Sequence, residues 1–130
     1  SEIIRQINAD VKKTRGLVAT IGVLDHQSKE WLVSGIGNIA VRLQKGLEYK
    51  NYSSYNGIVG LNIPGRIENN RYEMEKFQQL ILCSDGIKTR WDLMHYPSIL
   101  KYDPMLLAAA IYKDHGRRTD DMTILIVKVV

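Results

Sequence analysis

Short apolar segments of strand length, separated by turn residues, make up most of this sequence. Residues 17–24 and 30–35 flank a polar stretch rich in turn formers, a pattern that predicts a β-hairpin. The same pattern predicts further strands at residues 39–43, 47–52, 71–77, 79–84 and 122–130. Because residues 124–127 are continuously apolar, we expect the last strand to lie in the centre of its sheet.

Two regions have helical patterns instead. Apolar residues recur at helical spacing over residues 2–13 and predict an amphipathic helix that ends at Gly16. Residues 91–112 predict two helical pieces, and we expect Asp103 to cap the second piece, with Pro104 in its first position. A run of strands with the helices segregated from it is typical of an α+β sandwich.

Composition and charge argue against a membrane-spanning, a disulfide-bonded and a nucleic-acid-binding protein. The chain has 130 residues, enough for one domain, and its longest apolar runs are too short to span a bilayer. The start has no signal-peptide pattern, and a single cysteine, Cys83, excludes an internal disulfide, which favours a cytoplasmic location. The net charge is +4, but the basic residues are scattered and accompany no nucleic-acid motif. We therefore expect neither a nucleic-acid nor a membrane partner.

Two acidic turns carry the most distinctive chemistry. An apolar strand runs into Ser84, Asp85 and Gly86, and the adjacent acids Asp120 and Asp121 lead into the last apolar strand. Carboxylates that converge at one sheet edge repel each other, and a divalent cation such as Mg²⁺ or Mn²⁺ removes that repulsion. The residues alone leave an alternative open, because Asp-Gly is a common turn and an Asp pair before a strand is often solvated.

The segments around these turns resemble motifs of the metal-dependent protein phosphatases of type 2C, most closely those of the bacterial SpoIIE-like and RsbX-like branch. The sequences LILCSDGI at 80–87 and RTDDMTILIV at 118–127 resemble the last two metal motifs of that family. Further landmarks of the branch follow in the same order: TRG at 14–16, SGIGNI at 34–39, NGIVG at 56–60, TRWDL at 89–93, YP at 96–97 and AIYKD at 110–114. The resemblance covers nearly the whole chain.

The resemblance implies an α-β-β-α sandwich and a two-metal hydrolysis of phosphoserine or phosphothreonine by a metal-activated water, with no protein nucleophile. Asp85 and Asp120 would be metal ligands. Asp121, Gly86 and Asn38 would not touch the metal but would hold the ligands in position. From their position just before Asp120, and not from the resemblance, Arg117 and Arg118 could attract the substrate phosphate, with an ordinary solvated loop as the alternative. The substrate would be a phosphorylated regulatory protein of the anti-sigma antagonist or stressosome type, with an anti-sigma-type ATPase domain in the same or a neighbouring chain.

One departure from the family pattern is important. Family members begin with strands that carry an acidic residue and then an Asp-Gly pair, and no such element precedes Asp85 here. We therefore expect residues 1–130 to form the C-terminal portion of one phosphatase domain, lacking the N-terminal strands, with an incomplete metal site and no activity alone. Two alternatives stay open, a non-catalytic interaction module derived from this fold and an unrelated α+β binding domain in which the two acidic turns lie far apart.

Overall fold

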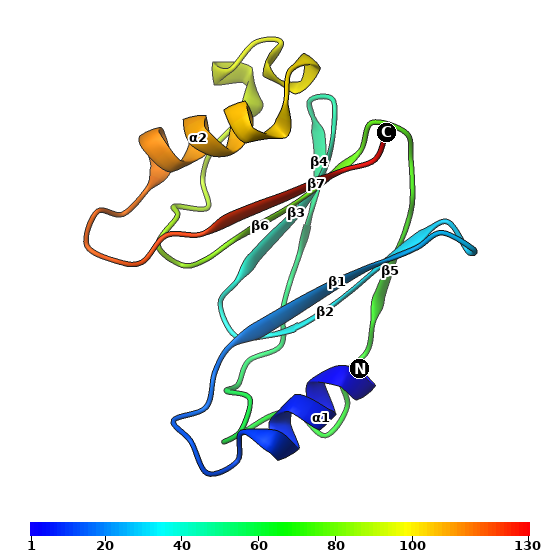
Figure 1. Ribbon diagram of the computed structural model, residues 1–130, viewed down its shortest axis with the longest axis vertical. Helices are drawn as coiled ribbons and strands as arrows, with labels where there is room; N and C mark the ends of the chain where they lie inside the picture. Colours follow the sequence, from blue (N-terminus) through cyan, green and yellow to red (C-terminus); the bar gives the residue numbers. More distant parts are fainter. The chain divides into compact units, whose positions relative to one another are not determined.

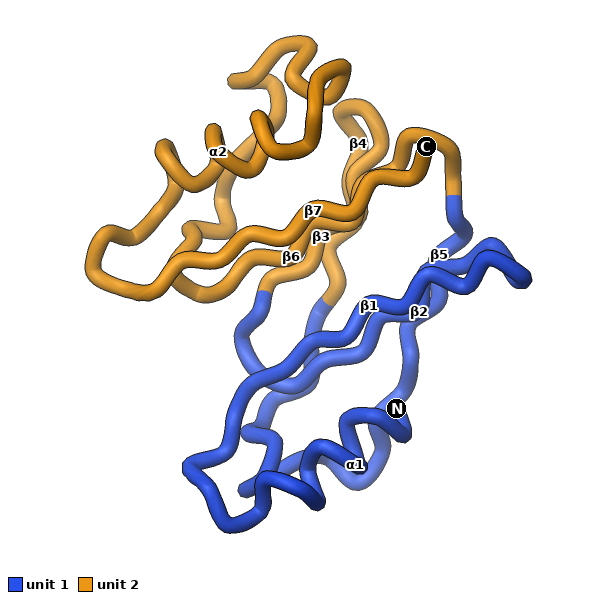
Figure 2. The backbone as a smooth tube through the Cα atoms, in the orientation of Figure 1, with its two compact units in different colours: residues 1–39, 53–74 blue, residues 40–52, 75–130 orange.

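A computed structural model describes residues 1–130, and its contacts divide the chain into two compact units (Figure 2). Unit 1 comprises residues 1–39 and 53–74, and unit 2 comprises residues 40–52 and 75–130. Each unit contains one antiparallel sheet and one α-helix (Figure 1). The chain is therefore an α+β protein, as the order of the strand and helix patterns predicts.

Unit 1 is built on a three-stranded sheet of order β1-β2-β5. Its elements are α1 (Glu2–Asp10), β1 (Ala19–Asp25), β2 (Glu30–Ile36) and β5 (Asn70–Glu73). The predicted hairpin is confirmed, because β1 and β2 pair from Ala19 opposite Ile36 to Asp25 opposite Glu30. Ile4 of α1 is fully buried in a core with Ile36, Val59 and Ile67, so the amphipathic helix turns its apolar side to this core.

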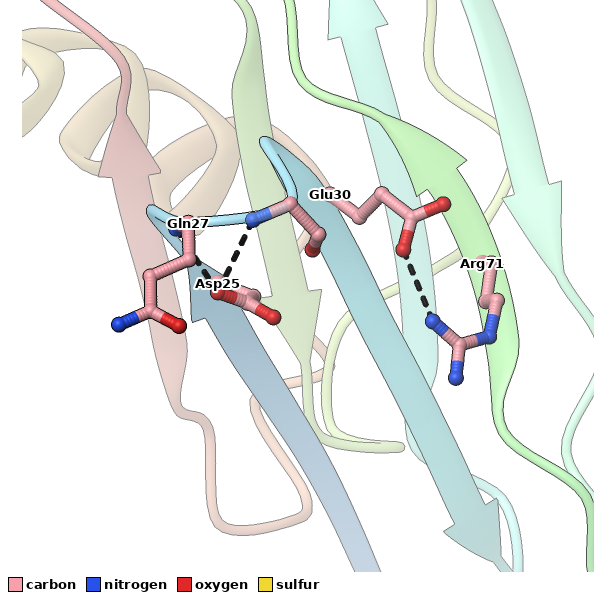
Figure 3. Close-up of polar contacts among 5 residues, drawn as sticks. Asp25, Gln27, Glu30 and Arg71 are labelled. Carbon is pink, nitrogen blue, oxygen red and sulfur yellow. Dashed lines mark hydrogen bonds and ion pairs between the residues drawn. The ribbon is translucent and has the colours of Figure 1, made fainter.

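Polar contacts fix the hairpin turn and the neighbouring strand of unit 1 (Figure 3). An Asp25 carboxylate oxygen accepts the N–H groups of Gln27 at 2.9 Å and Ser28 at 3.3 Å. Hydrogen bonds from the Ser28 side chain and then from the Gln27 N–H lower the pKa of Asp25 below its ordinary value. The Arg71 side chain on β5 forms an ion pair of 2.8 Å with Glu30 on the neighbouring strand β2.

Unit 2 is built on a four-stranded sheet of order β4-β3-β6-β7. Its elements are β3 (Ala40–Lys45), β4 (Glu48–Tyr52), β6 (Gln79–Cys83), the 3₁₀ helices η1 (Leu93–His95) and η2 (Ile99–Lys101), α2 (Pro104–His115) and β7 (Ile124–Lys128). Ile81 and Cys83 of β6 form a buried core with Leu107 and Ile111 of α2. None of the helices in the chain combines the length and the apolar character needed to cross a membrane.

The prediction of a central last strand is wrong, because β7 pairs only with β6 and lies at the edge of its sheet. Ile124 and Ile126 pack against the α2 core, whereas Leu125, on the opposite face, is 55% exposed. The continuous apolar run hides this alternation, because an apolar residue on the exposed face looks the same in the sequence as a buried one.

The first helical piece predicted within residues 91–112 is also wrong. Only the short helices η1 and η2 form there, and between them Ser98 adopts a left-handed conformation with φ of 65°. The second piece is confirmed, since Asp103 caps α2 by accepting the Met105 N–H at 2.8 Å and Pro104 is its first residue.

Candidate functional site

The two acidic turns adjoin at one end of the β6–β7 pair in unit 2. Cys83, the last residue of β6, is paired with Ile124, the first residue of β7. The chain therefore leaves β6 toward Asp85 at the same sheet edge where it enters β7 from Asp120 and Asp121. Antiparallel pairing alone dictates this meeting, because one strand ends where its partner begins.

Hydrogen bonds join the two turns. Ser84 donates its N–H to the Thr123 carbonyl at 3.0 Å, and Thr123 returns its N–H to the Ser84 hydroxyl at 2.9 Å. Farther along, the Arg117 N–H donates to the Gly86 carbonyl at 2.6 Å and the Lys88 N–H to the His115 carbonyl at 2.8 Å. Contacts on both sides of Asp85 thus hold its turn against the segment that carries Asp120.

Gly86 lies so close to the second turn that only glycine fits. A Cβ atom added to Gly86 would lie 2.0 Å from the Asp121 carbonyl oxygen and 2.8 Å from the Asp121 carbonyl carbon. Both contacts are with backbone, which cannot rotate away as a side chain can. The glycine is therefore required by the close approach of the two turns.

The carboxylates of the site are on its surface. Asp85, Asp120 and Asp121 are all exposed. One Asp120 oxygen accepts the Asp121 N–H at 2.8 Å, and the Asp120 N–H donates to the Arg117 carbonyl at 3.1 Å, so the turn orients its own carboxylate. Among the 130 residues, no group of three or more His, Cys, Asp or Glu side chains is arranged to hold a metal ion.

This donor set fits part of a site for a hard divalent cation. Mg²⁺ prefers carboxylate oxygen, and it is commonly held by one or two carboxylates while it keeps several waters. Asp85 and Asp120, on turns that hydrogen bonds join, supply such oxygens, with Asp121 next to them. A complete two-metal centre needs more protein ligands than these turns provide.

Exposed cations lie in the same chain segments as the acidic turns. Lys88, Arg90, Arg117 and Arg118 are all exposed, and none of their side chains forms an ion pair. The sequence predicted Arg117 and Arg118 from their position before Asp120. It did not single out Lys88 and Arg90, because only the pairing of Ile87 with Gly116 shows that their segment runs beside the second turn.

A buried arginine holds the segment that follows the Asp85 turn. The Arg42 guanidinium on β3 lies between the rings of Trp91, 3.7 Å from its centroid, and Tyr49, 4.0 Å from its centroid. It donates to the Trp91 carbonyl at 3.0 Å and the Thr89 carbonyl at 3.4 Å. Burial lowers the pKa of Arg42, and its charge is compensated by the two rings and two carbonyl dipoles. No sequence motif signals this role.

Cys83 takes no visible part in chemistry at the site. It is a free cysteine at the end of β6, buried in the α2 core. Burial raises the pKa of its thiol to about 11, although nearby Arg42 opposes the shift. A thiol with so high a pKa stays protonated at neutral pH and is then a poor nucleophile.

A Tyr96–Asp114–His115 cluster ties the segment between η1 and η2 to the end of α2. The Tyr96 hydroxyl donates to Asp114 at 2.5 Å and lies 3.3 Å from a His115 ring nitrogen. Burial, and then the hydrogen bond to Asp114 and its charge, raise the pKa of Tyr96 to about 12. The same hydrogen bond is the largest cause that lowers the pKa of Asp114.

These shifts predict how the cluster responds to pH. The raised pKa of Tyr96 adds stability that is complete below its ordinary pKa of 10 and is lost as pH rises through about 12. The lowered pKa of Asp114 adds stability that is present above its ordinary pKa of 3.8 and is lost as pH falls below it. We expect Tyr96→Phe to lower Tm between these limits and to have little effect beyond them. A Tm deficit independent of pH would contradict the assignment.

Asn38 lies in unit 1, in the bend after β2, whereas the acidic turns lie in unit 2. The supporting role that the resemblance implies for Asn38 remains a prediction. Gly37 beside it has a positive φ of 107°, and a Cβ there would lie 2.2 Å from a Val18 side-chain carbon. The Gly37–Asn38 bend is thus shaped by close packing on the segment before β1.

Sequence comparison finds no matching family model and no matching curated protein. Comparison with solved structures does find relatives of the fold. A structure from work on the bacterial stressosome as a modular system adapted to control secondary messenger signalling aligns with a TM-score of 0.84 and 22% identity, over 96% of this chain and 65% of that one.

Two further solved structures align over almost the whole chain, and one of them is a phosphatase domain by its name. RsbX in complex with magnesium aligns with a TM-score of 0.77 and 19% identity, over 99% of this chain and 64% of that one. The phosphatase domain of the cell fate determinant SpoIIE from Bacillus subtilis aligns with a TM-score of 0.60 and 20% identity, over 99% and 65%. The chain thus spans less than two thirds of each structure. At these identities the likeness shows the fold, which is that of the type 2C phosphatase domains.

Proposed function

We propose that this chain is the C-terminal part of a Mg²⁺- or Mn²⁺-dependent phosphatase domain that hydrolyses phosphoserine or phosphothreonine on a bacterial regulatory protein. One observation carries the proposal: in a fold of the type 2C phosphatase kind, the Asp85 and Asp120 turns are joined by hydrogen bonds at one sheet edge. The chain holds only part of such a site, so we expect turnover from the longer parent protein and not from residues 1–130 alone.

We propose the following roles for the residues of the site. Asp85 and Asp120 would hold the metal, while Asp121 and Gly86 keep the two turns in contact. When bound, the metal supplies an activated water and neutralises charge on the phosphate. Arg117 and Arg118, exposed and without ion pairs, would attract the phosphate of the substrate.

The partners we propose follow from the neighbours of the fold. RsbX and a protein from work on the bacterial stressosome are among them, which supports regulatory signalling proteins as partners. We propose a cytoplasmic protein whose substrate is an anti-sigma antagonist or a stressosome component, with an anti-sigma-type ATPase domain in the same or a neighbouring chain.

A second candidate function is a non-catalytic interaction module that keeps the fold without turnover. The observation in its favour is that no three potential ligands gather in these 130 residues. The two candidates differ in the parent sequence, because the enzyme needs an acidic residue and an Asp-Gly pair upstream of Ser1. They also differ in calorimetry, since the module binds no Mn²⁺.

The parent protein, assayed with phosphorylated casein and Mn²⁺, tests the proposal. We expect Asp85→Asn and Asp120→Asn each to weaken Mn²⁺ binding by at least about tenfold and to lower hydrolysis accordingly, because each removes a charged oxygen ligand. Glu48→Gln, an exposed acid on β4 of the same unit, is the matched control and should leave both unchanged. Full activity in either Asp variant would exclude the proposed roles.

A further inference from the structure

Unit 1 has an exposed apolar patch, in which three large apolar side chains reach the solvent. Leu17, Ile58 and Leu61 are 37%, 42% and 58% exposed. Ile58 and Leu61 lie on either side of Gly16, because a Cβ there would be 2.6 Å from Ile58 Cγ2 and 3.2 Å from Leu61 Cγ. Leu17, the next residue, is tied to the same loop by backbone hydrogen bonds with Val59 at 2.9 and 2.8 Å. We call these three side chains the Leu61 patch.

Hydrogen bonds within the chain hold the backbone of the Leu61 patch in one conformation. Ile58 and Asn62 exchange backbone hydrogen bonds of 2.8 and 2.9 Å, which close the loop between them. The Gly60 N–H donates to the Asn8 side-chain oxygen at 2.7 Å, which ties this loop to α1. Binding to a surface that is already ordered costs little conformational entropy, so even a small patch can contribute to affinity.

Three cations precede Gly16 and the Leu61 patch in the sequence. Lys12, Lys13 and Arg15 directly precede or flank the turn into Gly16, and they form the densest basic cluster of the chain. All three are exposed and none forms an ion pair. The Thr14 hydroxyl holds this turn in place, since it donates to the Val11 carbonyl at 2.8 Å and accepts the Gly16 N–H at 3.0 Å.

We propose that the Leu61 patch docks an acidic segment of a partner protein, with apolar side chains on the patch and Asp or Glu beside the three cations. Apolar contact at the centre and complementary charge at the rim are the usual composition of a specific protein interface. A second copy of this chain is disfavoured, because a symmetric contact would bring like charges together. A membrane surface is disfavoured, because the patch lacks the aromatic residues typical of bilayer interfaces.

A random peptide library displayed on phage, selected against the full chain, tests this inference. We expect the recovered peptides to combine Asp or Glu with Leu, Ile, Met or Phe. Leu61→Ser should weaken their binding by about tenfold, as loss of a central interface side chain does. Lys12→Glu with Lys13→Glu should weaken it mainly at low salt, where charge attraction is least screened. Ile58→Ser is a second variant for the case that Leu61→Ser disturbs folding.

Matched controls come from unit 2. Leu47→Ser removes an apolar side chain that is 64% exposed, and Lys50→Glu reverses an exposed charge on β4, and neither should alter binding. The inference is wrong if no acidic peptides are recovered or if Leu61→Ser binds them as tightly as the original chain. It is also wrong if Leu61→Ser instead abolishes binding to phosphatidylglycerol vesicles or self-association in ultracentrifugation. None of these readouts depends on phosphatase activity, so the inference stands or falls separately from the proposed function.

Discussion

Gly86→Ala is expected to destabilise the folded chain by about 3 kcal/mol or more, as a severe overpacking substitution does. The new Cβ would lie 2.0 Å from the Asp121 carbonyl oxygen, so the two acidic turns would have to separate. Their separation would also strain the hydrogen bond from the Arg117 N–H to the Gly86 carbonyl. Urea unfolding followed by tryptophan fluorescence measures the loss.

Gly65→Ala is the control for this prediction. A Cβ at Gly65 meets nothing within 4 Å and its φ is not positive, so the substitution should be neutral or slightly stabilising. Gly86→Ala should also weaken Mn²⁺ binding, because the Asp85 and Asp120 turns lose their alignment. A Gly86→Ala protein as stable as Gly65→Ala would show that the two turns do not meet as described.

Arg42→Ala is expected to cost about 2–4 kcal/mol, the range for losing a buried, packed and hydrogen-bonded side chain. The substitution empties the space between the Trp91 and Tyr49 rings and leaves the Trp91 carbonyl without its donor. We also expect residues 89–91 to become mobile, because Arg42 is their link to β3. Amide hydrogen exchange of these residues should rise by more than that of unit 1.

One further substitution separates charge from packing at Arg42, and another, at the exposed Arg71, is its control. Arg42→Met fills much of the space and removes a charge that is costly to bury, so its loss should be smaller than that of Arg42→Ala. Arg71→Ala breaks an exposed ion pair with Glu30 and should cost less than about 1 kcal/mol. Equal effects of Arg42→Ala and Arg71→Ala would contradict the role assigned to Arg42.

Much of the fold follows from local sequence rules. The β1–β2 hairpin and the Asp103 cap with Pro104 are predicted by turn and capping residues, whose effects act over a few neighbours. The edge position of β7 is not predictable in this way, because it depends on which strands pair across the chain. Likewise, the helix expected before Asp103 gives way to two 3₁₀ turns, since the left-handed Ser98 interrupts the backbone that hydropathy alone would continue.

The candidate site, like the fold, could be predicted from the sequence only in part. The sequence predicts Asp85 and Asp120 because their turns adjoin strand ends and resemble family motifs. It does not predict Arg42, because its aromatic partners come from a neighbouring strand and from a segment far along the chain. Lys88 and Arg90 were missed for the same reason, since a long-range backbone bridge brings their segment beside Arg117. Contacts over such separations leave no periodic signal in one sequence.

The most direct test of the metal assignment is paramagnetic line broadening by Mn²⁺ in the amide spectrum of this chain. Mn²⁺ held by the two acidic turns should broaden the amide signals of residues 84–87 and 117–123 first. The double variant Asp85→Asn with Asp120→Asn should abolish that pattern, whereas Glu48→Gln should preserve it. Broadening that is uniform, that is centred elsewhere, or that persists in the double variant would contradict a metal site at Asp85 and Asp120.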